Sequence, residues 1–223
     1  MDRAKLHRIY RYWIDWLYPN ICPCCGGYID YDADFCVDCK SRLNVCKDTL
    51  AVAHTDGAAA YCIYDDNIKG AVLAFKKNRN GNSYYAFACG IAEAVRKSSF
   101  AGDIDMIVPI PASKKNMKER GYNQSELIAQ ELRFLLGVPY GNVLVKAKET
   151  KVQKRLGMNE RAENVIGAFA VNEKNCDIAG KRLLVIDDVC TTGSTLAEAA
   201  KVLKENGAAK VYAAAFAKTP FKS

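Results

Sequence analysis

The chain has 223 residues, a mass of 24.6 kDa and a net charge of +7, with 50% apolar and 26% charged residues. This length and composition fit one globular α/β core with a small appendage. They exclude two full-sized domains and a disordered, collagen-like or coiled-coil protein. Polar side chains interrupt every apolar run and no export signal is recognisable, so we predict a cytoplasmic protein without a membrane span.

Residues 1–19 are predicted to form an amphipathic helix. Apolar and aromatic residues recur every three or four positions and form one stripe, at Leu6, Ile9, Tyr10, Trp13, Trp16 and Leu17. We expect this helix to pack on its own domain. The alternative is a helix that lies on a membrane surface or binds a partner, since the opposite face carries the basic residues Arg3, Lys5, Arg8 and Arg11.

Two C-x-x-C pairs with ten residues between them predict a zinc ribbon over residues 20–46. The four expected ligands are Cys22, Cys25, Cys36 and Cys39. Four thiolates close the coordination shell, so the zinc would be structural and would stabilise a segment too small for its own core. Cys24 and Cys46 leave the choice of ligands open. The remaining cysteines that we place in the core are Cys62, Cys89, Cys176 and Cys190.

The third unit, residues 47–223, is predicted to alternate strands and helices around a parallel sheet. Strands are expected within 49–64 and at 105–109, 143–145, 181–189 and 211–217, and helices at 67–76, 83–98, 124–136 and from the turn after 181–189 to about 205. Residues 147–164 are polar, basic and aperiodic. We expect them to form a long loop that acts as a lid or a binding loop.

One predicted strand ends in Asp187 and Asp188, and a hydroxyl-rich turn then opens a helix. The turn residues are Thr191, Thr192, Gly193, Ser194 and Thr195. A helix N-terminus offers unpaired N–H groups and partial positive charge, which predicts a phosphate site. The two carboxylates suit sugar hydroxyls or a divalent metal. The plain alternative is a helix cap without a ligand, and a nucleotide P-loop is excluded because no lysine follows the glycine.

This segment resembles the phosphoribosyl pyrophosphate (PRPP) signature of type I phosphoribosyltransferases, in which a hydrophobic strand leads into two acidic residues and Thr-Thr-Gly-Ser-Thr. The resemblance implies the fold of that family, a parallel sheet flanked by helices. It also implies that Asp187 and Asp188 hold the ribose hydroxyls, that residues 191–195 hold the 5′-phosphate, and that Mg²⁺ accompanies PRPP.

Further motifs resemble the ComF family, phosphoribosyltransferase-like proteins associated with natural competence. They are Val108-Pro-Ile-Pro, Arg120-Gly-Tyr-Asn-Gln, Thr150, Gln153, Arg161-Ala-Glu-Asn and Gly167-Ala-Phe, together with the cysteine pairs. The similarity runs from about residue 17 to the C-terminus. Cys190 and Ser194 depart from the residues that many relatives carry, but neither change removes a phosphate donor.

Positive charge is concentrated in residues 110–162, with 11 Lys and Arg against 5 Asp and Glu, so the other 170 residues are nearly neutral. If PRPP reacts, the basic residues after the strand at 105–109 could stabilise the pyrophosphate leaving group; these are Lys114, Lys115, Lys118 and Arg120. The turn at Lys76 and Lys77 either contributes or is simply solvated. Gln153, Arg155 and Arg161 would belong to the lid.

Three functions stay open. The first is a phosphoribosyltransferase for an unknown acceptor, with Asp187, Asp188, Lys114 and Arg120 as catalytic residues and Lys115 among the ligand contacts. The second is a protein that handles single-stranded DNA, with PRPP as a regulatory ligand or a vestigial site and the ribbon docking a DNA-uptake helicase. The N-terminal aromatic residues and Tyr122 are the candidates for base stacking. The third is a purely structural adaptor.

Overall fold

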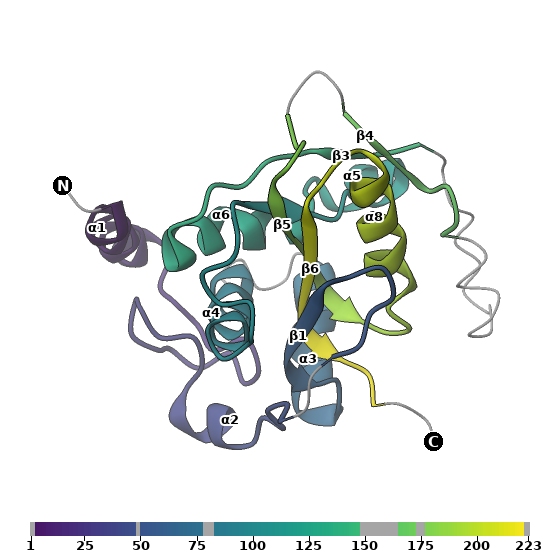
Figure 1. The fold of residues 1–223 in the computed structure, drawn as a ribbon. Coiled ribbons are helices and arrows are strands. Elements are labelled where there is room, and N and C mark those ends of the chain that lie inside the picture. The colour runs from purple at the N-terminus through teal and green to yellow at the C-terminus, as the bar shows by residue number, and fades with distance from the viewer. Residues whose placement is uncertain (1–2, 48–49, 78–82, 148–164, 173–176, 221–223) are drawn as a thin grey trace.

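The computed structural model describes residues 3–47, 50–77, 83–147, 165–172 and 177–220. Its centre is a parallel sheet with the strand order β1-β6-β5-β2 (Figure 1). The strands are β1 (Gly57–Ile63), β2 (Met106–Pro109), β5 (Arg182–Cys190) and β6 (Lys210–Lys218). A parallel bridge between Ile107 and Tyr140 extends the sheet beyond β2. The predicted parallel sheet is confirmed.

Helices cover both faces of this sheet (Figure 1). One face packs against α3 (Asp66–Lys76), α4 (Ser83–Arg96) and α6 (Gln124–Leu136), and the other against α8 (Ser194–Glu205). Successive residues of β5 alternate between the two layers: Leu184 joins the α3/α4/α6 side and Leu183 joins the α8 side. Because both faces are covered, the strand is apolar along most of its length and lacks the alternation of a half-exposed strand.

Four short elements complete the described fold. They are α2 (Val37–Ser41), α5 (Lys114–Arg120), β3 (Leu144–Lys146) and β4 (Phe169–Val171), and β3 pairs with β4 in an antiparallel hairpin. The sequence did not predict α2, α5 or β4, since elements of three to seven residues are too short to show an apolar period. The predicted lid at residues 150–164, with Gln153, Arg155 and Arg161, lies outside the described residues.

The predicted core cysteines divide into three groups. Cys62 and Cys190 are buried, Cys89 is half-buried, and Cys176 lies outside the described residues. The two buried thiols contact opposite layers of the core.

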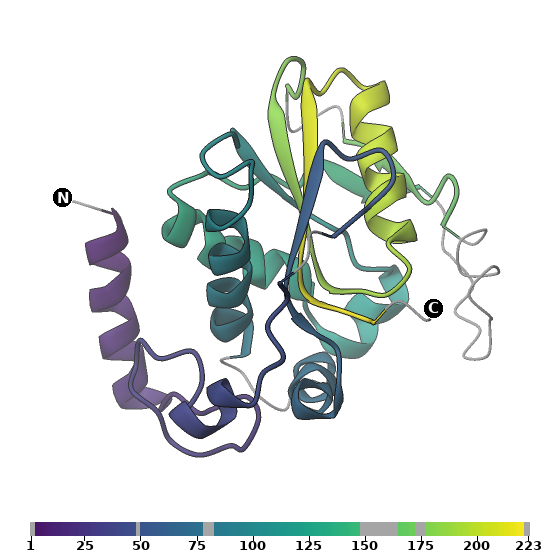
Figure 2. The same ribbon diagram turned by 60° about the horizontal axis from the view of Figure 1, so that its bottom comes forward.

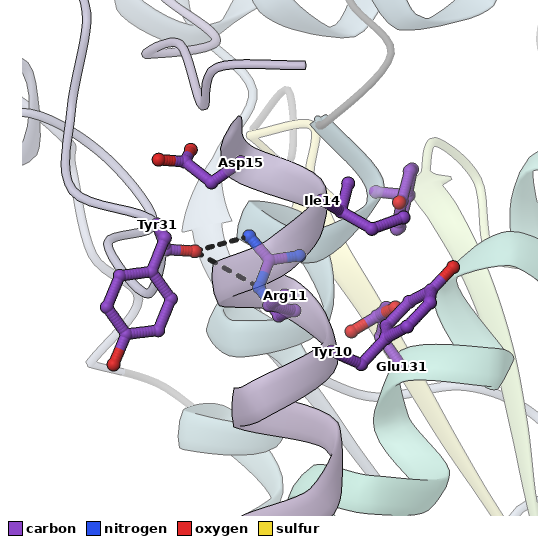
Figure 3. Close-up of a pocket in the computed structure, with 7 residues that line it drawn as sticks. Tyr10, Arg11, Ile14, Asp15, Tyr31 and Glu131 are labelled. Carbon is purple, nitrogen blue, oxygen red and sulfur yellow. Dashed lines mark hydrogen bonds between the residues drawn. The ribbon is translucent and has the colours of Figure 1, made fainter. Parts of the chain in front are cut away.

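The N-terminal helix α1 (Arg3–Leu17) packs beside α6 (Figure 2), and Arg11 points from it toward Tyr31 (Figure 3). His7 Nε2 lies 3.0 Å from Oε2 of Glu131. The Arg11 guanidinium donates to the carbonyl of Tyr31 at 3.1 and 2.8 Å and stacks 3.3 Å from the ring centroid of Tyr85. The buried Arg11 is thus hydrogen-bonded, and the buried His7 lies beside a carboxylate.

The apolar stripe of α1 faces solvent. Its most exposed member, Trp16, retains 81% of its surface. We expected the helix to pack on its domain and it does, through His7 and Arg11 rather than through the apolar stripe. The reason is that His7 and Arg11 find buried partners on the domain. Within the described residues, no helix is long and apolar enough to cross a bilayer.

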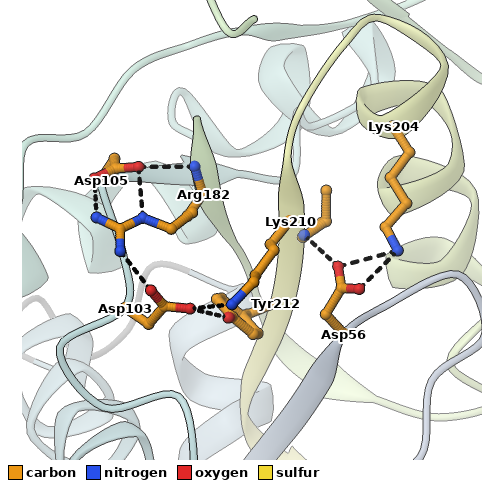
Figure 4. A network of polar contacts seen from close by, with 8 residues as sticks. Asp56, Asp103, Asp105, Arg182, Lys204, Lys210 and Tyr212 are labelled. Atoms are coloured by element: carbon orange, nitrogen blue, oxygen red, sulfur yellow. Dashed lines mark hydrogen bonds and ion pairs between the residues drawn. The ribbon is translucent and has the colours of Figure 1, made fainter. Parts of the chain in front are cut away.

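The amino ends of β5 and β6 are held by a polar network (Figure 4). Asp103 accepts from Arg182, from Tyr212 and, at 2.8 Å, from Lys210. Asp105 accepts from the backbone and from Nε of Arg182, both at 2.9 Å. Hydrogen bonds from Arg182 and its charge hold the pKa of Asp105 at about 2. The pKa of Asp103 is also lowered, and the hydrogen bond from Lys210 is the largest cause.

Candidate functional site

The four cysteines of the two C-x-x-C pairs form one cluster that fits a metal ion. The Sγ atoms of Cys22, Cys25, Cys36 and Cys39 all lie within 4.8 Å of one another. Tetrahedral zinc with Zn–S bonds of about 2.3 Å requires sulfur atoms about 3.8 Å apart, and Cys25 Sγ lies 3.8 Å from Cys36 Sγ. This cluster can therefore hold a metal such as zinc.

Backbone hydrogen bonds favour the thiolate of Cys22, whereas burial raises the pKa of the Cys39 thiol. Although burial raises the pKa of the Cys22 thiol, the backbone N–H groups of Cys25, Cys36 and Cys24 lower it to about 7. Cys24 is not part of the cluster, and burial raises the pKa of its thiol to about 12. Cys46 pairs its backbone with Tyr61 beside β1. The geometry thus favours the four predicted cysteines over the two spare ones.

The second candidate site lies where the parallel strands end. Carboxyl ends of parallel strands meet at one edge of a sheet, which is the usual ligand position in open α/β folds. The hydroxyl-rich turn follows β5, α5 follows β2 and α3 follows β1. Residues far apart in the sequence therefore meet at this edge.

Asp187 and Asp188 contact two helices of the same layer. Oδ1 of Asp187 accepts from Oγ of Ser125 in α6 at 3.0 Å. Oδ2 of Asp188 lies 3.0 Å from Nζ of Lys76, the last residue of α3. Each carboxylate also accepts the backbone N–H of the next residue at 2.9 Å. These contacts fix both acids at the edge of the sheet.

The charge of Asp188 disfavours ionisation of Asp187. Burial and the neighbouring charge of Asp188 raise the pKa of Asp187 to about 7. Burial alone would lower the pKa of Lys76, but the Asp188 carboxylate raises it above its ordinary value. Asp187 increases that rise and Arg120 opposes it, so Arg120 lies within electrostatic range of this lysine. The site therefore combines two acids with two cations.

The turn after β5 leaves the N-terminus of α8 open. Gly193, the N-cap residue, adopts φ +77°, a conformation that side-chain-bearing residues rarely take, and it has no side chain to cap the helix. The backbone N–H of Ser194 donates to Oγ1 of Thr192 at 3.4 Å. The hydroxyls of Thr192 and Ser194 lie 2.8 Å apart, and Thr191 and Thr192 are exposed while Thr195 is half-buried. Free N–H groups and hydroxyls at a helix start suit an anion.

The predicted basic residues lie on one helix but differ in their exposure to solvent. All of Lys114, Lys115, Lys118 and Arg120 lie on α5, which begins with Ser113 accepting from the backbone N–H of Asn116 at 3.1 Å. Lys114, Lys115 and Lys118 are exposed, and Lys115 lies 3.8 Å from Glu119. The structure thus brings Arg120 close to the Lys76–Asp188 pair and leaves three lysines at the surface of α5.

Sequence reasoning undervalued Lys76 and missed Ser125. A lysine at the end of a helix is usually solvated, so the pairing of Lys76 with Asp188 had no sequence signal beyond its charge. Ser125 directly follows the Arg120-Gly-Tyr-Asn-Gln motif, which could have drawn attention to it. Tyr122, considered for base stacking, packs against Phe75 and donates its hydroxyl to the carbonyl of that residue.

Comparison with known proteins agrees with this geometry. Residues 81–222 match the family model described as "Phosphoribosyl transferase domain". The chain is 26% identical to Competence protein F of Haemophilus influenzae, over 85% of this chain and 81% of that protein. It is 29% identical to Competence protein ComFC of Bacillus subtilis, over 85% and 74% of the two chains. The DNA utilization protein YhgH of Escherichia coli is 36% identical over 48% of this chain and 46% of its own.

The family match covers more than half of the chain and the central sheet has the expected parallel arrangement. The chain belongs to the phosphoribosyl transferase domain family, as a phosphoribosyltransferase-like protein of the ComF type.

Proposed function

We propose that the carboxyl edge of the sheet binds PRPP, or a related sugar phosphate, together with a divalent metal, and transfers the phosphoribosyl group to an acceptor. The observation that carries this proposal is the position of Asp187 and Asp188 just before the hydroxyl-rich turn that opens α8. The turn at residues 191–195 would bind the 5′-phosphate and the two acids would face the ribose.

The acids also fit a hard cation. Among the described residues, hydrogen bonds to Asp187 reach only Oδ1, which leaves Oδ2 for a metal ion or a ribose hydroxyl. A bound Mg²⁺ would neutralise part of the pyrophosphate charge. Asp187 and Asp188 are the residues that would hold it, directly or through the sugar hydroxyls.

The cations suit the leaving group. In the proposed transfer, the bond from C1 of the ribose to the pyrophosphate oxygen breaks, a bond from C1 to the acceptor forms, and pyrophosphate departs with the bonding electrons. Positive groups that face the departing oxygens stabilise this charge as it develops. Lys76 contacts Asp188, Arg120 lies within electrostatic range of Lys76, and Lys114 and Lys115 are further candidates on α5.

A melting experiment with PRPP and MgCl₂ tests the proposal. A ligand that binds only the folded state at 100 times its Kd stabilises it by about 2.7 kcal/mol, and we expect a Tm increase of about 5–10 °C. Asp187→Asn with Asp188→Asn should abolish the increase. Asp66→Asn, which changes an exposed acid on α3, is the matched control and should keep it. The proposal is wrong if the unmodified protein shows no increase.

A second candidate is binding of single-stranded DNA, with PRPP as a regulatory ligand. It is favoured by the three exposed lysines of α5 and by the names of the relatives, which refer to competence and DNA utilization. We expect DNA affinity to fall steeply with salt, and Lys114→Glu, Lys115→Glu and Lys118→Glu together to flatten that dependence. Binding that is absent or independent of salt would exclude this candidate. Docking of a DNA-uptake helicase on the ribbon remains a prediction.

A further inference from the structure

The ammonium of Lys76 covers the carboxylate of Asp188. Nζ lies 3.0 Å from Oδ2, which has no contact with solvent, and the whole Asp188 side chain is only 10% exposed. The other oxygen, Oδ1, accepts the backbone N–H of Val189 at 2.9 Å. A hydroxyl in solution therefore reaches Oδ2 of Asp188 only when the groups that cover it move, and Lys76 is the cation that contacts it.

The structure allows the side chain of Lys76 to move while its backbone stays in place. Lys76 is the last residue of α3, and the hydroxyl of Tyr122 holds the preceding carbonyl, that of Phe75. Phe75 itself is buried among core aromatic residues. The side chain is 34% exposed and has a flexible four-carbon stem, so its ammonium can leave Asp188 without displacing the helix end.

Moving Lys76 away from Asp188 requires a replacement anion. The charge of Arg120 is nearby and disfavours a second unpaired cation, and partial burial makes an uncompensated ammonium unfavourable. A pyrophosphate group on the ligand supplies such an anion. A sugar phosphate that carries only the 5′-phosphate does not, because that group would occupy the turn at residues 191–195.

On the basis of the proposed function, we propose that Lys76 makes the site selective for PRPP over ribose 5-phosphate. In the empty site its ammonium pairs with Asp188. When PRPP binds, a ribose hydroxyl takes its place at Asp188 and the ammonium pairs with a pyrophosphate oxygen. Lys76 is thus a specificity-determining residue, and the exchange breaks no covalent bond.

Isothermal titration of the full-length protein with PRPP and with ribose 5-phosphate, both with MgCl₂, tests this exchange. The measured quantity is the ratio of the two Kd values. We expect Lys76→Met to reduce the preference for PRPP by about tenfold or more, through weaker PRPP binding and unchanged or tighter ribose 5-phosphate binding. Lys76→Arg should retain most of the preference. Lys77→Met, at the adjacent exposed lysine, should leave it within about twofold.

Lys76→Gln serves as a second variant if Lys76→Met does not fold, because the amide can still donate to Asp188 without carrying a charge. It should lower the preference in the same direction. A ratio that stays within about twofold in a folded, uncharged variant overturns the inference while PRPP binding and the proposed function stand. Equal affinity of the unmodified protein for the two ligands also overturns it. Absence of PRPP binding to the unmodified protein overturns both.

Discussion

The amino and carboxyl ends of the central sheet both carry acidic residues, but they use them differently. At the amino end, Asp103 and Asp105 lie against Arg182, Lys210 and Tyr212 (Figure 4). Exposed hydrogen bonds lower the pKa of both acids, so the fold favours their charged form. At the carboxyl end, burial raises the pKa of Asp187, so the fold disfavours its charged form.

The amino-end acids stabilise the fold in their charged form, whereas the charged form of Asp187 lowers the stability of the protein without ligand. The amino-end acids gain hydrogen bonds from donors on β5 and β6, which joins the strands. The carboxyl-end acids are adjacent in the chain, only Asp188 contacts Lys76, and both precede the hydroxyl-rich turn that opens α8. Residues that destabilise the empty protein are expected at ligand sites, where a ligand supplies the missing interactions.

The largest effect that we expect is the loss of structure at the cysteine cluster, which leaves both ends of the sheet unchanged. Cys36→Ser, or a strong chelator, should remove the metal and unfold the ribbon at residues 20–46, because metal binding supplies about 10–16 kcal/mol to structural zinc sites in peptides. Hydrogen exchange should rise in that segment while the PRPP-induced Tm increase persists.

The matched control for the ribbon is Cys24→Ser, which changes the cysteine outside the cluster. It should leave one zinc per chain in metal analysis of freshly purified protein. Absence of zinc from the unmodified protein would contradict the ribbon.

The next effect is at the amino end. Arg182→Ala removes the donor that Asp103 and Asp105 share, so we expect the Tm to fall by roughly 5 °C. The Tm increase caused by PRPP should not change, because the site lies at the opposite end of β5. Loss of that increase in a folded variant would show that the two ends are coupled.

Asp187→Asn should give the opposite pattern at the carboxyl end. The raised pKa means that the folded protein loses stability as the pH rises from the ordinary aspartate range toward 7, where the buried group must ionise. The neutral amide avoids this loss. At pH 8 and without ligand, we expect the Tm to rise by about 2–4 °C, and PRPP to have no further effect. A lower Tm would contradict the inference that the ionised form of Asp187 destabilises the fold.

Acid pH should produce the smallest effect, at the amino end. The lowered pKa values of Asp103 and Asp105 mean that their contribution is present above the ordinary aspartate pKa of about 3.9 and is lost as the pH falls toward about 2. Denaturant melts between pH 5 and pH 2 should show this loss, and Arg182→Ala should reduce it. The same slope in both proteins would assign acid sensitivity to other groups.

Much of the fold could be predicted from the sequence. The helix at 124–136 is confirmed at both ends, and the strands at 105–109 and 181–189 are confirmed to within one residue. Long periodic or continuous apolar segments specify such elements because burial dominates their energy. The short helix α5 escaped prediction, since it is capped by Ser113 and Gly121 and has no buried side chain.

The candidate sites also contain parts that the sequence predicted and parts that it did not. The spacing of the cysteine pairs determined which four thiols form the cluster, because local turns bring each pair together. The two acids and the turn that follows them are adjacent in the chain, so the sequence of this one segment was enough to predict that they lie together. Their roles toward PRPP remain predictions.

The sequence by itself determined the long elements, the two cysteine pairs and the signature that ends β5 and follows it, since each depends on neighbouring residues and on local periodicity. Only the tertiary structure decided that Lys76 contacts Asp188 and that Ser125 contacts Asp187. Both partners lie far from β5 along the chain, with 62 positions between Ser125 and Asp187. It also decided that α1 turns its aromatic stripe outward. Such contacts depend on how distant elements pack, and a single chain carries no local pattern for them.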